Sequence, residues 1–367
     1  MPSLGFSPCG GISFYSAGFT IPRESLIVRG AECGGISRRT VGNTQIPSEG
    51  TLLNLRGLLL LAAPQSVGGQ AVIEGVMMRA KNTLAIAVRK SDGEIVTEVR
   101  PWFTMIRHPL LKKPFVRGFP VLMETMVNGI KALNYSAMQA ADGDEEAGEL
   151  TNWHLALTMV LALGAALGLF VVLPHFLSVG MEMLGWAGDV ESLSFHAWDG
   201  VIKMLVFVGY ILAISYIPDI RRVFEYHGAE HKVIWTWEDG KDLSPAATRF
   251  YSRLHPRCGT AFLLFVLAVS ILLYAVLVPY LLTFYSPEHF AAKHLYIVAM
   301  KLVLMVPVSC VAYEMIKFAG KYSRNFLCRI LCWPGLMMQL LTTKEPDDSQ
   351  VEVAIAALQC AVNPEEC

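Results

Sequence analysis

Residues 261–282 read AFLLFVLAVSILLYAVLVPYLL, and none of their side chains is charged. An α-helix of this length extends about 33 Å, which is enough to cross the hydrocarbon core of a bilayer. Three more apolar segments approach that length, at about 153–176, about 201–217 and about 295–318. We therefore predict a mainly α-helical polytopic membrane protein with about four transmembrane helices.

The composition of the whole chain supports this fold class. Of the 367 residues, 53% are hydrophobic and 17% are charged, and the mean hydropathy is +0.44. Soluble proteins carry more charge than this, so the lipid bilayer is the first expected partner. The formal net charge of −1 gives no basis for a nucleic-acid partner. The eight cysteines include no C-x-x-C pair, and we expect them to be reduced thiols.

Basic residues are distributed unevenly among the segments between the predicted spans. Residues 67–131 contain ten Lys and Arg and residues 218–258 contain seven, whereas residues 178–199 contain none and residues 285–294 contain one. Loops rich in Lys and Arg stay on the cytoplasmic side of a membrane. This pattern predicts that both termini and the loop 218–258 are cytoplasmic.

The chain before the spans divides into two parts. Residues 1–66 are rich in Gly, Ser and Pro without sustained periodicity, which predicts a disordered leader or a misannotated N-terminal extension. In residues 67–150, two alternating apolar runs at 84–89 and 94–99 flank an Asp-Gly turn. This pattern is typical of a β-hairpin. We expect residues 67–150 to form a small α+β cytoplasmic N-terminal domain.

A basic segment at 107–117 leads into an apolar stripe with helical spacing over 119–133. Such a helix could dock on an anionic membrane surface, or it could pack on the β unit or on the membrane helices. Both alternatives remain open at this point. Residues 142–149 (DGDEEAGE) are predicted to be an acidic linker to a membrane domain at 151–341.

Two segments follow the last predicted span. Residues 326–341 contain Arg329 and Pro334-Gly335, and their length favours an interfacial or re-entrant segment over a full crossing. Residues 342–367 are predicted to be a cytoplasmic C-terminal tail whose helix begins with a capping box at Ser349-Gln350-Val351-Glu352. An isolated helix this short is unstable, so we expect it to pack on another cytoplasmic part of the protein.

The cytoplasmic loop contains the string Phe224-Glu225-Tyr226-His227-Gly228-Ala229-Glu230-His231-Lys232. Positions i and i+4 of a helix share a face, so His227 and His231 could bind one metal ion. Glu230 lies on the adjoining edge of that face. The order H-x-x-E-H is the reverse of H-E-x-x-H and has a known hydrolytic use. Glu230 is therefore the candidate catalytic residue, as a general base that takes a proton from water.

Three other side chains are predicted to lie at the same level of the membrane. His255 and Cys258 precede the third span, and Glu314 lies about one turn from the cytoplasmic end of the fourth. Together with His227 and His231, they form the candidate metal-binding set for a divalent metal, which we expect to be zinc. Three protein ligands would leave a catalytic site open, whereas four would close a structural site.

Each candidate also has a plainer interpretation. His227 and His231 could be ordinary interfacial residues, Cys258 could be a small buried residue, and Glu314 could pair with Lys317 or Arg324. No role is expected for the isolated histidines or for the intramembrane lysines, whose long side chains should extend to the membrane surface: His154, His175, His196, Lys203 and Lys301.

Four strings stand out along the chain: GGQAVIEGVMMR (68–79), YHGAEHK (226–232), HPRCGT (255–260) and TTKEPDDSQVEVAIAAL (342–358). In this order they resemble the YqhQ-like family of bacterial membrane proteins, from about Val67 to Leu358. The resemblance implies a multi-pass protein of the bacterial cell (inner) membrane with a cytoplasmic leading domain. Members are sometimes labelled metal-dependent enzymes. This label favours a metal site on His227, His231, His255 and Cys258 but supplies no substrate.

Two functional hypotheses follow. The first is a metal-dependent hydrolase at the cytoplasmic membrane face, acting on a membrane-protein or lipid-linked substrate. The second is a non-catalytic assembly, scaffold or transport-associated protein with a structural metal site or none. A carrier that uses Glu314 and Lys301 is less attractive, because the predicted spans show no repeat and no paired broken helices.

Overall fold

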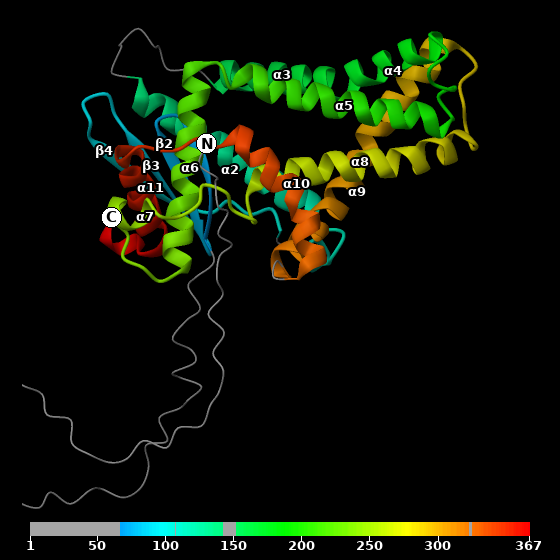
Figure 1. The fold of residues 1–367 in the computed structure, drawn as a ribbon. Coiled ribbons are helices and arrows are strands. Elements are labelled where there is room, and N and C mark those ends of the chain that lie inside the picture. Colours follow the sequence, from blue (N-terminus) through cyan, green and yellow to red (C-terminus); the bar gives the residue numbers. More distant parts are fainter. Residues whose placement is uncertain (1–66, 107, 142–151, 323–324) are drawn as a thin grey trace, which may run out of the picture. The chain divides into compact units, whose positions relative to one another are not determined.

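The computed structural model describes residues 67–106, 108–141, 152–322 and 325–367. The predicted leader at 1–66 and the predicted linker at 142–149 lie outside these residues. The chain first forms a four-stranded antiparallel sheet in the order β1-β2-β3-β4 (Figure 1). The strands are β1 (Val67–Val72), β2 (Gly75–Ala80), β3 (Thr83–Arg89) and β4 (Ile95–Pro101). The predicted hairpin is confirmed as β3 and β4, which pair from Arg89 with Ile95 to Thr83 with Pro101.

Side chains alternate along each strand and therefore point to both faces of the sheet. Helices cover each of these faces. Val76 and Met78 point to one face and join a core with residues of α6 (Pro218–Glu238) and α11 (Asp348–Val362). Met77 points to the other face and joins a core that includes Ala132 of α2 (Gly118–Ala140). Helices from distant parts of the sequence therefore complete the fold that the sheet begins.

Helix α11 packs on β2 and β3, as its apolar face led us to expect, and Figure 1 places it beside β3. Its capping box begins two residues earlier than predicted. Asp347 is the N-cap residue: its side chain accepts from the backbone N–H of Gln350, whose own side chain accepts from the backbone N–H of Asp347. Asp-x-x-Gln satisfies the capping pattern as well as Ser349-x-x-Glu does, and here it is the one used.

Helix α2 is the predicted amphipathic helix, and it follows the short helix η1 (Pro109–Lys112). It packs on the sheet through Ala132 and also packs on α9 (Phe290–Lys321). Packing inside the protein is thus the alternative that the structure supports for this helix. At its start, the guanidinium of Arg117 donates to both carboxylate oxygens of Glu314 in α9, each at 2.7 Å.

Among the residues that the structure describes, four helical runs are long and apolar enough to cross a membrane: Val160–Met183, Leu193–Ile214, Gly259–Leu282 and Phe290–Ala319. The first run combines the second half of α3 (Asn152–Leu167), the π-helical turn η2 (Gly168–Val172) and α4 (Leu173–Met183). The others are α5 (Leu193–Ile214), α8 (Gly259–Leu282) and most of α9. These runs agree with the four predicted spans in number and in approximate position.

The second run begins well before the predicted residue 201. The two turns of α5 before residue 201 contain His196 and Asp199, which reduce the local hydropathy and hid these turns from a purely apolar pattern. Lys203 follows one turn after Asp199, inside the predicted span. In the helix these two residues are i and i+4 neighbours, and they form a buried ion pair with an N–O distance of 2.6 Å. The pair neutralises one charge of each sign inside the helix packing.

The segment after α9 forms a continuous helix, α10 (Phe326–Thr342), with Pro334 inside it. It packs against α8 and α9. The short helices α7 (Pro245–Thr248) and η3 (Pro364–Glu366) complete the described elements. The expectation of reduced cysteines is wrong at the C-terminus, because Cys360 and Cys367 form a disulfide. Cys258, Cys310, Cys328 and Cys332 are free and buried.

Candidate metal centre

Helix α6 brings the three central side chains of the motif together. His227, Glu230 and His231 are 8%, 5% and 1% exposed, so all three are buried. Their spacing of three and four residues places them on neighbouring parts of one helical face. The helix is anchored one turn earlier, where Arg222 forms a bidentate ion pair with Glu74 in the β1–β2 turn.

His227, His231 and Cys258 form a group whose ligand atoms all lie within 4.8 Å of one another. His227 Nδ1 lies 2.8 Å from the carbonyl oxygen of Thr342, and His231 Nδ1 lies 2.6 Å from that of Arg253. A carbonyl can only accept, so both Nδ1 atoms carry the proton. In the neutral ring, this hydrogen bond leaves the lone pair on Nε2. This tautomer is the one that orients a histidine as a metal ligand.

Cys258 approaches the same point from the start of another helix. It is the N-cap residue of α8, and its Sγ accepts from the backbone N–H of Thr260 at 3.4 Å. Sγ lies 3.1 Å from His227 Nε2. The N-terminal end of a helix favours a negatively charged group such as a thiolate ligand.

The donor set fits a divalent metal of the zinc type. Two imidazole nitrogens and one thiolate are ligands that zinc prefers, and zinc sites with three protein ligands keep a fourth position open. His231 Nε2 is buried without a hydrogen-bond partner among the residues that the structure describes. A buried nitrogen of this kind normally costs free energy, which a bound cation would recover.

His255 lies next to this group but outside it. Its ring centre is 5.7 Å from that of His231, and its Nδ1 accepts from the backbone N–H of Arg257 at 3.3 Å. The side chain of Gln339 holds its backbone at both ends, since it accepts from the N–H and donates to the carbonyl of His255, each at 2.8 Å. Burial lowers the pKa of His255 to about 4, although Glu230 acts in the opposite direction. His255 is thus neutral at pH 7, and it lies beside His231 without belonging to the group of three ligands.

Glu230 faces away from solvent and towards the sheet. Burial raises the pKa of its carboxyl group above the usual value, while His227, His255 and the backbone N–H of Gly69 lower it in part. The contact with Gly69 is close, because a Cβ atom at that position would lie 3.0 Å from the carboxyl carbon of Glu230. The GGQ string of β1 therefore forms one wall around the carboxylate.

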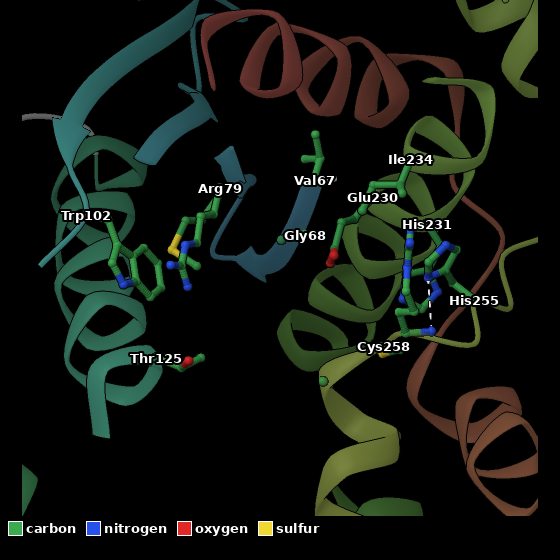
Figure 2. A pocket seen from close by; sticks show the side chains of 14 residues that line it. Val67, Gly68, Arg79, Trp102, Thr125, Glu230, His231, Ile234, His255 and Cys258 are labelled. Atoms are coloured by element: carbon green, nitrogen blue, oxygen red, sulfur yellow. Dashed lines mark hydrogen bonds between the residues drawn. The ribbon is translucent and has the colours of Figure 1, made fainter. Parts of the chain in front are cut away.

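A cavity of about 210 Å³ lies between the β unit and these side chains. Figure 2 shows Glu230, His231, His255 and Cys258 on one side of it and Arg79 with Trp102 on the other. The guanidinium of Arg79 stacks on the Trp102 ring, 3.8 Å from its centre. Sequence reasoning gave no role to the cavity-lining residues Arg79, Trp102 and Arg257. Arg257 stands between two predicted ligands, but its position in the sequence does not show that it faces a cavity.

The connection between α10 and α11 completes the site. A Cβ atom at Gly228 would lie 2.0 Å from the carbonyl oxygen of Lys344, so only glycine lets this connection approach α6 so closely. The backbone N–H of Lys344 donates to the carbonyl of Phe224 at 2.8 Å. Two residues earlier, Thr342 supplies the carbonyl that orients His227. Each of the four strings that carry the family resemblance therefore supplies a contact to this site.

Glu314 is not brought into this group. Both of its carboxylate oxygens bind Arg117, and it is absent from the residues that line the cavity. Of the two alternative partners, Lys317 forms no ion pair with Glu314 in the part of the chain that the structure describes, and Arg324 lies outside that part. Of the five predicted metal ligands, the structure thus groups His227, His231 and Cys258, places His255 beside them and places Glu314 elsewhere.

Fold and site together define a class: proteins with four membrane-length helices and a buried His-His-Cys group facing a small antiparallel sheet. Residues 113–364 match a family model described as "Protein of unknown function (DUF1385)", and the chain belongs to this family. "Uncharacterized protein YqhQ" of Bacillus subtilis (strain 168) is 33% identical over 305 residues, covering 80% of this chain and 91% of that protein. The predicted resemblance is therefore confirmed. No solved structure matches the chain.

Proposed function

We propose that this protein is a metal-dependent hydrolase of the bacterial cell membrane, with its site and both termini on the cytoplasmic side. The observation that carries the proposal is a buried carboxylate, Glu230, on the same helical face as His227 and His231 and at the wall of a cavity. Ligand nitrogens with a fixed tautomer and an adjacent carboxylate are the components of metal-assisted hydrolysis.

Metal binding and proton transfer are assigned to different residues of the site. A divalent metal held by His227, His231 and Cys258 would supply a Lewis acid that polarises a carbonyl or phosphoryl oxygen. Glu230 takes a proton from the attacking water as the new O–C or O–P bond forms, and it then passes this proton to the leaving group. Burial raises the pKa of Glu230 above its usual value, and a raised pKa strengthens a carboxylate as the proton acceptor from water.

The cavity favours an anionic, membrane-borne substrate. Arg79 and Arg257 both line it, and Arg79 makes no carboxylate ion pair within the described parts of the chain. Arginine is the side chain best suited to bind phosphate in a partly buried site. The neighbouring start of α8 brings the cavity close to the membrane surface, where a lipid-linked phosphate would be presented.

A non-catalytic protein with a closed structural metal site is the alternative. A closed site needs a fourth protein ligand. The neighbouring side chain His255 has its Nδ1 engaged by the backbone N–H of Arg257, and it lies outside the group of three. The open position therefore favours the hydrolase.

The test compares zinc-loaded wild-type protein with Glu230→Gln in detergent micelles, using one phosphate-ester probe and one peptide-amide probe. We expect turnover of the phosphate ester, and a kcat about 10²- to 10⁴-fold lower in the variant at unchanged metal content. An Arg79→Met variant should raise KM for the phosphate probe. Absence of turnover of both probes by the metal-loaded wild-type protein contradicts the hydrolase and leaves the structural alternative.

A further inference from the structure

A second group of ionisable side chains lies inside the apolar helices, apart from the metal centre. His175 is on α4, Asp199 and Lys203 are on α5, and His294 and Lys301 are on α9. Each is at most 5% exposed. The prediction that the two lysines extend to the membrane surface is wrong, since their ammonium groups bind Asp199 between the helices.

The five side chains form one continuous chain of contacts. Lys203 Nζ lies 2.6 Å from Asp199 Oδ2, and Lys301 Nζ lies 3.1 Å from Asp199 Oδ1. Lys301 Nζ also lies 3.2 Å from His175 Nδ1. His175 Nε2 in turn lies 3.0 Å from His294 Nδ1. An ionisable residue inside a membrane span is costly and marks a functional site by default, and here five are in contact.

The hydrogen-bond directions along this chain are mutually consistent. An ammonium group can only donate, so Lys301 donates to His175 Nδ1, and His175 then carries its proton on Nε2. That proton is donated to His294 Nδ1, which leaves the His294 proton on Nε2. Each group can therefore accept a proton on one atom and release one from another, in a single direction from Lys301 to His294.

The charges of the cluster do not balance when all three charged groups are ionised. Two ammonium groups and one carboxylate leave one positive charge among side chains that are each at most 3% exposed. Removal of one proton makes the cluster neutral, which the low-dielectric surroundings favour. A purely structural ion pair would need one lysine and no histidines. The second lysine and the two histidines are what a labile proton requires.

The groups that face the cluster come from every helix packed around it. Helix α8 contributes Tyr274, whose hydroxyl donates to the carbonyl of Lys301 at 2.8 Å and whose ring lies 4.9 Å from Lys203 Nζ. Helix α5 adds His196, which is 2% exposed. No further carboxylate contacts the two lysines among the described residues. Asp199 is therefore the one negative charge in contact with them there.

The series of contacts from His294 through His175 to Lys301 runs from one face of the helices towards their middle. His294 lies four residues and Lys301 eleven residues after the first residue of α9, or about 6 Å and about 16 Å along the helix. The start of α9 lies at the same end as the α4–α5 connection, because Lys293 forms an ion pair with Glu191 at 2.9 Å. A bilayer core is about 30 Å thick, so Lys301 lies near mid-depth.

We propose that Asp199, Lys203 and Lys301 form a proton-binding site inside the membrane, and that His175 and His294 transfer its proton to and from the face at which α9 begins. By the positive-inside rule, this is the face opposite the metal centre. The proton is held on the amine of Lys301. It leaves through His175 and His294 as each N–H bond breaks and the next one forms.

Two measurements on the full-length protein in lipid nanodiscs test the proposed proton site and its transfer path. The first is the histidine tautomer, read from ring ¹⁵N shifts assigned with His175→Gln and His294→Gln. The second is the number of protons taken up between about pH 9 and about pH 5. We expect His175 to be protonated on Nε2 in the wild-type protein and to change its tautomer population in Lys301→Met.

Lys203→Met distinguishes a proton-binding site from a buried ion pair that only holds the helices together. This variant removes the excess charge without touching His175, so it should keep the tautomer but take up about one proton fewer per chain. Lys293→Met, which breaks the surface ion pair with Glu191 and removes none of the contacts among the five side chains, is the matched control and should change neither readout. If both intramembrane variants fold but take up as many protons as the control, the proton site is excluded. An unchanged His175 tautomer in Lys301→Met excludes the relay.

Discussion

The backbone N–H of Gly69 in β1 donates to the carboxylate of Glu230 in α6, and a methyl group on Gly69 would lie 3.0 Å from that carboxyl carbon. The edge of the sheet thus fixes the position of the candidate general base. The small β unit is consequently part of the site, although no residue of it belongs to the predicted metal-binding set.

Gly69→Ala should reduce hydrolysis without removing the metal. The new methyl group would also lie 2.7 Å from the carbonyl oxygen of Met77 and 2.9 Å from Met78 Sδ, so strand β1 must shift relative to β2 and to the Glu230 carboxylate. We expect kcat to fall at least about 10-fold at unchanged zinc content, since a displacement of about 1 Å can cost more than that. Gly68→Ala is the matched control, because nothing lies within 4 Å of its Cβ position. Equal activity of both variants would contradict this role for Gly69.

Gly228→Ala should cost about 3 kcal/mol of unfolding free energy or more. Its Cβ would lie 2.0 Å from the carbonyl oxygen of Lys344, and backbone on both sides leaves little room to relax. The displaced connection would carry Thr342 away from His227, so metal affinity should fall as well. Thermal unfolding in detergent measures the first effect. Gly209→Ala in α5 has open space around it and should be neutral or stabilising.

Glu124→Gln should destabilise the β unit by about 2 kcal/mol at pH 7. Burial would raise the pKa of Glu124, but donation by Thr104, by the backbone of Ile106 and Met105 and by Trp102 outweighs it and holds the pKa below the usual value. The carboxylate therefore stabilises the fold fully above the unfolded pKa of about 4.3, and this contribution is lost as pH falls through the folded value.

Unfolding midpoints of wild-type protein and Glu124→Gln should accordingly converge as the pH is lowered from about 7 to about 3. Glu94→Gln, at an exposed i,i+4 pair with Lys90, serves as the control and should shift the midpoint little at any pH. A gap between wild type and Glu124→Gln that stays constant over this range would show that the charge of Glu124 is not the stabilising feature.

Asp347→Ala should destabilise α11 by about 1 kcal/mol, since it removes the side chain that caps the helix. Ser349→Ala should cost less than about 0.5 kcal/mol, because its hydroxyl binds only the Asp347 carboxylate. Hydrogen exchange of the first turn of α11 reports both effects. A larger destabilisation by Ser349→Ala than by Asp347→Ala would instead support the capping box that the sequence predicted at Ser349.

The apolar spans and the central motif were predictable because both rest on local patterns. A run of about twenty apolar residues can be recognised without knowledge of the fold, and so can the spacing of four between His227 and His231. Cys258 was predicted from its position just before α8, and it does reach the two histidines.

What the sequence could not supply are partners that lie far apart along the chain. Glu314 was a plausible ligand until Arg117, 197 residues away, was found on both of its oxygens. Lys301 likewise appeared isolated, because Asp199 and His175 meet it only once three helices have packed. Long-range pairing of charged groups decides which of several plausible candidates share a site, and no local periodicity encodes it.

Metal content tests the central claim most directly. Protein purified in detergent without chelators, and after zinc add-back, should contain about one zinc ion per chain by elemental analysis. A His227→Ala, His231→Ala double variant should contain none, while His289→Ala, which removes an exposed histidine, should match the wild type. Absence of bound metal from correctly folded wild-type protein, or equal binding by the double variant, would contradict the metal centre and the hydrolase built on it.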